Sequence, residues 1–172
     1  ATLLGGRAAR LPSPVRTRFI TLNEVAPETA GWFLNLNAAH FGDKPTTETP
    51  KAGTVEDWVY INMTGDTHPM HTHLFTFKVM GRYNYDADRY AAKYGTANGV
   101  PQLDVSTLRP FLKSGLIEPG PDEAGLKETV KANPGQVTVV RARFSLPSTA
   151  LNGAGKLIKP QKYVHHCHIV EH

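Results

Sequence analysis

The segment HHCHIVEH at residues 165–172 places the strongest constraint on what this chain can form. It holds the only cysteine and four of the eight histidines in the sequence. If the segment leaves a β-strand, alternation of side chains directs His166 and His168 to one face and Cys167 to the other. Thiolates and imidazoles are soft ligands that suit copper or zinc. The spacing therefore predicts that one tripeptide serves two metal centres.

A second histidine cluster, HPMHTH at residues 68–73, has the same alternation. His71 and His73 stand two residues apart, so an extended backbone directs both to one face. Pro69 restricts His68 to extended conformations and is expected to separate it from a continuing strand ladder. The two clusters together predict two donor sets. A trigonal His₂Cys site of the blue-copper type is made of His68, Cys167 and His172. A separate thiolate-free cluster is made of His71, His73, His166 and His168.

The remaining histidines and the choice of metal have less specific interpretations. A lone histidine is usually a surface or satisfied core residue, and His40 is interpreted in that way. His165 is interpreted as a residue that either supports the ligands or faces solvent. Zinc is the competing metal, because Cys and His also bind it. A lone cysteine is often only a small buried hydrophobe, but here seven of eight histidines lie in two short clusters, one of them around the cysteine.

At these residues the chain resembles a known family. HPMHTH and HHCHIVEH are similar to the HPxHxH and HCHxxxH motifs of multicopper oxidases, above all to bacterial laccases of the spore-coat (CotA) type and bilirubin oxidases. The likeness covers about residues 15–82 and 122–172 and includes TETPKAGT at residues 47–54 and GLKETV at residues 125–130. It implies a cupredoxin fold and copper as the cofactor.

The resemblance also assigns a copper type to each ligand. The type 1 ligands that it implies are His68, Cys167 and His172. The type 2 ligand is His71, and the type 3 ligands are His73, His166 and His168. Family members place an axial methionine ten residues after the cysteine, a position beyond residue 172. In the family the trinuclear cluster takes eight histidines, half of them from an N-terminal domain, and this chain supplies four.

The implied activity is that of a laccase-like oxidase. It would take single electrons from phenolic or other aromatic reductants at type 1 copper and reduce dioxygen to water at the trinuclear cluster. Cys167, His166 and His168 would be the catalytic link between the two centres. We expect residues 1–14 to be a linker from upstream domains and residues 15–172 to be a C-terminal cupredoxin domain, truncated at its C-terminus. Activity is expected to require the remaining domains of the same oxidase.

Other functions account for part of the pattern. A stand-alone electron-transfer cupredoxin explains the His₂Cys set but leaves four histidines without a role. Copper nitrite reductase pairs blue copper with a mononuclear second copper, which fits paired HxH and HCH motifs poorly. Oxidation of cuprous or ferrous ions is a variant of the oxidase hypothesis, and the three methionines provide no Met-rich segment for it.

Composition excludes several partners. The formal charge is +4 and the basic residues are scattered, so binding to nucleic acid is unsupported. No apolar stretch of about 20 residues exists, so no membrane span is expected. Residues 1–9 have no apolar core of the signal-peptide kind. The compartment stays open, and the family resemblance favours an extracellular, cell-surface or spore-coat location.

The chain in order predicts an all-β fold, a cupredoxin-like Greek-key β-sandwich. Strands are predicted at residues 16–24, 31–36, 54–63, 74–80, 136–144 and 161–167. Gly81 is expected to end its strand. A long irregular insertion is expected at about residues 83–121, with a short helix at residues 86–93 capped by Asn84 or Asp86. The insertion either lines a binding site or decorates the surface.

Overall fold

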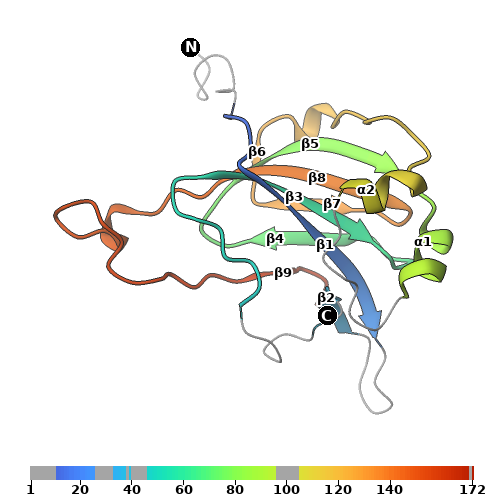
Figure 1. Cartoon of the computed structure of the whole chain (residues 1–172), viewed down its shortest axis with the longest axis horizontal. Coiled ribbons are helices and arrows are strands. Elements are labelled where there is room, and N and C mark those ends of the chain that lie inside the picture. Colours follow the sequence, from blue (N-terminus) through green and yellow to red (C-terminus); the bar gives the residue numbers. More distant parts are fainter. Residues whose placement is uncertain (1–10, 26–32, 38, 40–45, 96–104, 171) are drawn as a thin grey trace.

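The computed structural model describes residues 11–25, 33–37, 39, 46–95, 105–170 and 172 (Figure 1). Strands dominate, as the sequence predicts. They are β1 (Arg16–Val25), β2 (Phe33–Leu36), β3 (Val55–Asn62), β4 (His68–Thr72), β5 (Phe77–Asn84), β6 (Leu126–Lys127), β7 (Thr129–Ala132), β8 (Gln136–Arg143) and β9 (His165–Cys167). Two helices, α1 (Ala87–Tyr94) and α2 (Val105–Leu108), lie between β5 and β6. No helix in the described ranges is long and apolar enough to cross a membrane.

The strands form two sheets that pack face to face, which confirms the sandwich. The large sheet has the order β2-β1-β3-β8-β5-β6 and the small sheet the order β7-β4-β9. Both histidine clusters belong to the small sheet, because β4 carries the first cluster and β9 begins the second. Between β8 and β9, residues 145–164 run far out from the sandwich and back (Figure 1). β9 thereby reaches β4 from a segment distant in sequence.

Apolar side chains pack on both faces of the large sheet, and the side chains of β3 contribute to both of these layers. Its residues are buried almost without interruption, so no polar face alternates with an apolar one. Trp58 and Tyr60 point into the space between the sheets, where they pack with Met70 and Phe77. Val59 and Ile61 point the other way, into a second apolar cluster. A strand buried on both faces tends to be apolar at successive positions, and residues 58–61 of β3 (WVYI) show this, although Glu56 and Asp57 precede them.

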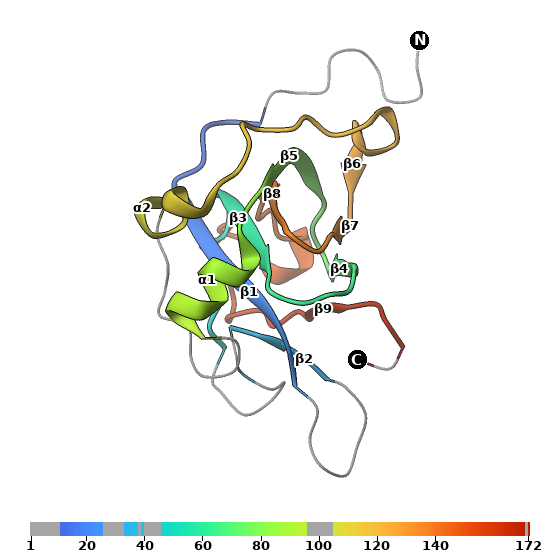
Figure 2. The same cartoon turned by 90° about the vertical axis from the view of Figure 1, so that its right-hand side faces the viewer.

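The second apolar cluster is built by the insertion. Tyr90 of α1 and Phe111 are buried against the outer face of the large sheet. Figure 2 shows α1 and α2 on the side of that sheet away from β4, β7 and β9. The helix predicted at residues 86–93 is confirmed, with the Asp86 side chain accepting a hydrogen bond from the Arg89 N–H as its N-cap. The described part of the insertion therefore extends the core on the face of the large sheet away from the small sheet that carries the histidine clusters.

Several strand boundaries differ from those predicted. The prediction that Gly81 ends its strand is wrong, because β5 continues to Asn84 through a bulge between Val79 and Gly81. Gly81 has φ +135°, and a Cβ there would meet the Ile117 carbonyl oxygen and the Leu116 side chain. The glycine thus lets the insertion pair closely with β5 rather than ending it. β9 is shorter than predicted, β6 and β7 were not predicted, and of the strand predicted at residues 31–36 the first two residues lie outside the described ranges.

Replacing Gly81 tests this close approach. Gly81→Ala should lower the free energy of unfolding by about 2 kcal/mol or more, because the backbone is strained for an L-residue and the methyl group meets a carbonyl. Gly115→Ala is the matched control, since nothing lies within 4 Å of the added Cβ. Urea denaturation of the three proteins measures the difference. Equal stability of the two variants would contradict the role given to Gly81.

Candidate metal centres

The register between β4 and β9 sets the position of every candidate ligand on these strands. The two strands are antiparallel, with Met70 opposite Cys167 and His71 opposite His166. Directly opposed residues in a sheet point to the same face. His68, Met70 and Thr72 are buried in β4 and alternate with the less buried Pro69 and His71. Cys167 therefore joins the inner face, and His166 joins His71 on the outer face.

Pro69 was expected to separate His68 from a continuing strand ladder. It lies within β4, opposite Lys131 of β7, so that expectation is wrong. Its carbonyl oxygen accepts a hydrogen bond from the His168 N–H at 2.9 Å. Pro69 has no N–H to donate in return, and the β9 strand ends at Cys167. Beyond that point the chain is released from the sheet and turns toward His172.

The inner face brings together the three residues of the predicted His₂Cys site. Cys167 Sγ lies 3.6 Å from His68 Nδ1 and 3.8 Å from His172 Nδ1. The two imidazole rings are 5.3 Å apart between centroids. The His172 N–H donates to the Ile169 carbonyl at 3.1 Å, which closes the turn that returns this ring to the sulfur. One sulfur and two nitrogens thus converge on one point.

Hydrogen bonds around His68 decide which ring nitrogen is free to bind a metal. His68 is fully buried, and its Nε2 lies 2.6 Å from Thr64 Oγ1. The Thr64 hydroxyl donates to Asn62 Oδ1 at 2.8 Å, so it accepts from His68. Nε2 therefore carries the proton, and Nδ1 presents its lone pair toward Cys167. The pKa of His68 is lowered to about 4, mainly by burial and also by the charge of His172, with Asp66 opposing the shift.

The surroundings of the sulfur also matter for its chemistry. The Ile169 N–H donates to Cys167 Sγ at 3.4 Å. Burial raises the pKa of the Cys167 thiol, although this N–H acts in the opposite direction. A half-buried sulfur with its own donor and two imidazoles facing it is an environment that stabilises a metal-bound thiolate better than a free one. Glu24 of β1 approaches the same rings; burial and the charge of Asp66 raise the pKa of its carboxyl, and His172 opposes the shift.

The outer face gathers the other four predicted ligands. Donor nitrogens of His71, His166 and His168 lie within 4.8 Å of one another. His73 joins them at the edge, with its Nε2 3.2 Å from His166 Nε2. The ring centroids of neighbouring pairs are 4.9 to 5.4 Å apart. His73 and His168 are exposed, so this cluster opens to the surface.

In two rings of the outer cluster a backbone carbonyl binds Nδ1, whereas in His68 the hydrogen-bonded nitrogen is Nε2. His71 Nδ1 donates to the Glu128 carbonyl at 3.0 Å and also lies 2.9 Å from Thr129 Oγ1. His166 Nδ1 donates to the Cys167 carbonyl at 2.8 Å. A carbonyl only accepts, so Nδ1 carries the proton in both rings and Nε2 is free for a metal. The two centres therefore offer different nitrogens, and backbone acceptors of this kind leave no signal in a sequence.

The leftover histidines have separate outcomes. His165 turns to the core, where its Nε2 lies 2.9 Å from the Tyr60 hydroxyl and its ring packs edge-on against Trp58. Burial lowers its pKa to about 3, with His166 and His71 adding to the shift. The alternative that it faces solvent is therefore wrong. His40 lies outside the described residues.

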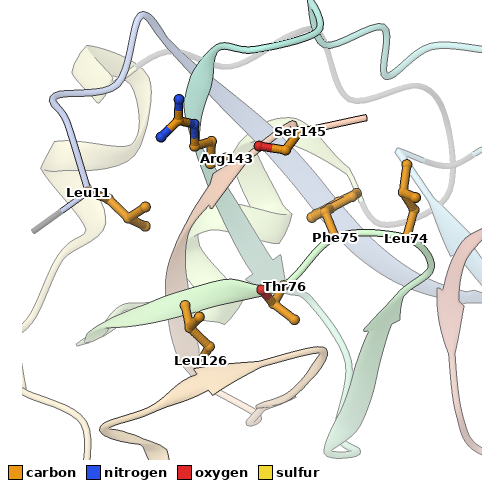
Figure 3. A pocket seen from close by; sticks show the side chains of 7 residues that line it. All are labelled: Leu11, Leu74, Phe75, Thr76, Leu126, Arg143 and Ser145. Carbon is orange, nitrogen blue, oxygen red and sulfur yellow. The ribbon is translucent and has the colours of Figure 1, made fainter. Parts of the chain in front are cut away.

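A pocket lies next to the first histidine cluster but is not part of either centre. It measures about 260 Å³ and lies beyond Leu74 and Phe75, which directly follow His73 (Figure 3). Its walls are made of Leu11, Leu74, Phe75, Thr76, Leu126, Arg143 and Ser145. None of these residues is a predicted ligand. The metal chemistry of the described residues therefore belongs to the two histidine groups.

The donor sets fit copper. One thiolate with two imidazoles is the set of a blue-copper site, and imidazoles alone suit copper in a second centre. The sequence model of the multicopper oxidase family matches residues 12–172. The chain belongs to the multicopper oxidase family.

Relatives of this multicopper oxidase chain include bacterial and plant proteins. A laccase from Bacillus subtilis is 37% identical over 139 residues, covering 81% of this chain and 22% of the laccase. Multicopper oxidase LPR1 from Arabidopsis thaliana is 32% identical over 168 residues, covering 95% of this chain and 28% of that protein. The chain thus spans about a quarter of the length of these relatives.

Solved structures agree on the fold. A Campylobacter jejuni multicopper oxidase, described as a metallo-oxidase, aligns with a TM-score of 0.58 at 18% identity and covers 96% of this chain and 29% of that one. McoA multicopper oxidase from Aquifex aeolicus aligns with a TM-score of 0.51 at 23% identity, covering 91% of this chain and 26% of that one. The sandwich is therefore the fold of a cupredoxin-like multicopper oxidase domain.

The lowered pKa values of His68 and His165 predict an acid-sensitive metal-free protein. The unfolded chain protonates both histidines near pH 6.5, whereas the folded values are about 4 and about 3. Stability should therefore be constant above pH 6.5 and fall as the pH drops to 5, by up to about 1.4 kcal/mol per pH unit for each group. Urea denaturation in chelator measures this slope.

A single substitution isolates one of the two contributions. His165→Gln removes the titrating ring and should reduce the slope between pH 6 and 5 by about half. A stability that stays flat over this window, or a slope that His165→Gln leaves unchanged, would contradict the assignment.

Proposed function

We propose that this chain supplies the type 1 copper site and half of the trinuclear ligands of a laccase-like multicopper oxidase. The type 1 ligands are His68, Cys167 and His172. The trinuclear ligands are His71 for type 2 copper and His73, His166 and His168 for type 3 copper. When bound, copper supplies one-electron oxidation of phenolic or other aromatic reductants at the first site and four-electron reduction of dioxygen to water at the second.

The observation that carries the proposal is the position of the two donor groups on opposite faces of β4 and β9. Cys167 faces inward with His68, whereas its neighbour His166 faces outward with His71. The sulfur and the His166 ring are thus joined by one peptide unit. A second short path runs from Cys167 to His168 on its other side. A covalent route of this length favours electron transfer between two sites that share no ligand.

Hydrogen bonds within the chain fix which nitrogen of each ligand ring is protonated before a metal binds. Thr64 fixes the proton of His68 on Nε2, and the Glu128 carbonyl fixes that of His71 on Nδ1. Both rings then offer the nitrogen that faces the centre. His68 is buried and His172 is nearly so, which keeps water from the first site. Ligand rings locked in this way need little rearrangement on metal binding or on a change of oxidation state.

The exposed face of the four-histidine cluster is the surface that we assign to contact with the remaining domains of the oxidase. The four clustered histidines lie at the surface, with His73 and His168 exposed. The relatives from Bacillus subtilis and Arabidopsis thaliana are about four times as long as the matched part. We place the other trinuclear ligands on domains that cover this face. Dioxygen reduction would then require the assembled protein.

The sulfur is tested by removing it. Copper-loaded wild-type protein should absorb at about 600 nm through charge transfer from thiolate to copper. In the intact oxidase that carries this chain, Cys167→Ser should abolish that band and reduce oxygen consumption with a phenolic substrate to background. Spectrophotometry and an oxygen electrode give the two readings. A Cys167→Ser protein that loses the band but still consumes oxygen would overturn the proposal.

The outer cluster is tested separately, which also distinguishes the oxidase from a stand-alone cupredoxin. His71→Ala should retain the band at about 600 nm and lose at least about 100-fold in oxygen consumption, since even residues that support ligands are worth about 10- to 100-fold. Glu118→Ala, which removes an exposed carboxylate from the insertion, should change neither reading. Full turnover by His71→Ala would contradict the role given to the outer cluster. One copper per wild-type chain without oxygen consumption would favour the stand-alone cupredoxin.

A further inference from the structure

Glu24 stands out among the acidic side chains of the described residues. It lies at the end of β1, and its Oε1 is buried yet makes no hydrogen bond within the described structure. The same atom is 3.3 Å from His68 Nε2 and 3.8 Å from His172 Nε2. It thus lies between the outer nitrogens of both imidazoles of the His₂Cys site. The inner nitrogens of those rings face the sulfur.

The direction of this side chain follows from the strand. Ile20 and Leu22 of β1 are fully buried in the core between the two sheets. Side chains two residues apart share a face, so Glu24 points into the same space. At that end of β1 the core is replaced by the two histidine rings. The fold therefore directs a carboxylate toward the metal site from the opposite sheet.

Other carboxylates in the core have a different kind of partner. Glu56 binds Arg18 through two hydrogen bonds of 2.6 and 3.0 Å. Glu123 binds Arg82 through two of 2.6 and 2.7 Å. Asp57 binds Arg141 in the same bidentate manner. In the described part of the chain, the ion-pair partners of Glu24 are His68 and His172 alone.

A buried carboxylate without a cation is costly unless positive charge is supplied. An imidazole bound to a metal through Nδ1 supplies it, because Nε2 keeps its proton and the ring becomes more positive. Ligand histidines commonly give this second N–H to a carboxylate, which orients the ring and makes the ligand more basic. Glu24 lies beside Nε2 of both rings, and because Thr64 already accepts the His68 N–H, its interaction with that ring is electrostatic.

We propose that Glu24 is the positioning residue of the His₂Cys copper site, acting on His68 and His172 together. The inference rests on the proposed function, since it requires copper at this site. Glu24 holds both rings against rotation and places a negative charge close to the metal. That charge stabilises the cupric over the cuprous state and lowers the reduction potential. Thr64 accepts the His68 N–H, whereas Glu24 lies beside the outer nitrogens of both rings.

Two substitutions separate the charge from the contact. Glu24→Gln removes the charge and keeps an oxygen acceptor, and Glu24→Ala removes both. In the copper-loaded oxidase, Glu24→Gln should raise the reduction potential of the blue copper with little change in its visible and EPR spectra. Glu24→Ala should also weaken copper binding by about 10-fold or more and alter the EPR hyperfine splitting. Redox titration, EPR and competition with a chelator measure these effects.

Two controls sharpen the comparison. Asp66 is exposed near the same histidines but has no ion pair with either ring in the described structure, so Asp66→Asn should shift the potential less than Glu24→Gln. Glu118→Ala removes an exposed carboxylate from the insertion and should change none of the readings. An equal shift from Asp66→Asn and Glu24→Gln would overturn the inference, because general charge alone would then explain it.

The failure of this inference is distinguishable from that of the proposed function. Without a thiolate–copper band in the wild type, the proposed site itself is wrong. A wild-type band together with unchanged potential, spectra and copper affinity in both Glu24 variants rejects the role of Glu24 only. If Glu24→Ala does not fold, as judged by circular dichroism, the potential of Glu24→Gln decides the question. An unchanged potential then overturns the inference.

Discussion

The pairing of β4 with β9 in one register is the constraint on which both centres depend. It places Met70 opposite Cys167 and His71 opposite His166. A slip by one residue would exchange the two faces of β9, because side chains alternate. The sulfur would then face the surface cluster and His166 the core. The register is held from the core side, where fully buried Met70 packs in the apolar cluster that Cys167 touches.

Prediction from the sequence succeeded where alternation alone decides geometry. The HxH and HCH patterns predicted two donor groups on opposite faces, and the structure brings the donors of each group together. It failed where distant chain segments meet. Nothing near Glu24 in the sequence indicates the histidines that it approaches, and the carbonyl of Glu128 has no residue-type signal at all. The prediction that Gly81 ends its strand was wrong because a sequence does not distinguish a glycine that ends a strand from one that permits close pairing.

The insertion illustrates a second limit of sequence patterns. Its length indicated either a binding site or a surface decoration, and its described residues add a second apolar core to the outer face of the large sheet. Tyr90 and Phe111 bury their rings against the outer face of β3 and its neighbours. Residues 58–61 of β3 are apolar on both faces because a core lies on each side of the strand. A sheet packed in this way is rigid, and the short β4 and β9 strands are supported by it through Trp58 and Tyr60.

The two donor groups differ in how completely this chain encloses them. The inner group has a fully buried His68 and a sulfur that receives its own N–H, with Thr64 and Glu24 around the rings. The outer group has its carbonyl acceptors in place but leaves His73 and His168 exposed. A site that accepts single electrons works with three fixed ligands. Under the proposed function, the exposed cluster is the side on which other domains of the oxidase would complete the oxygen-reducing site.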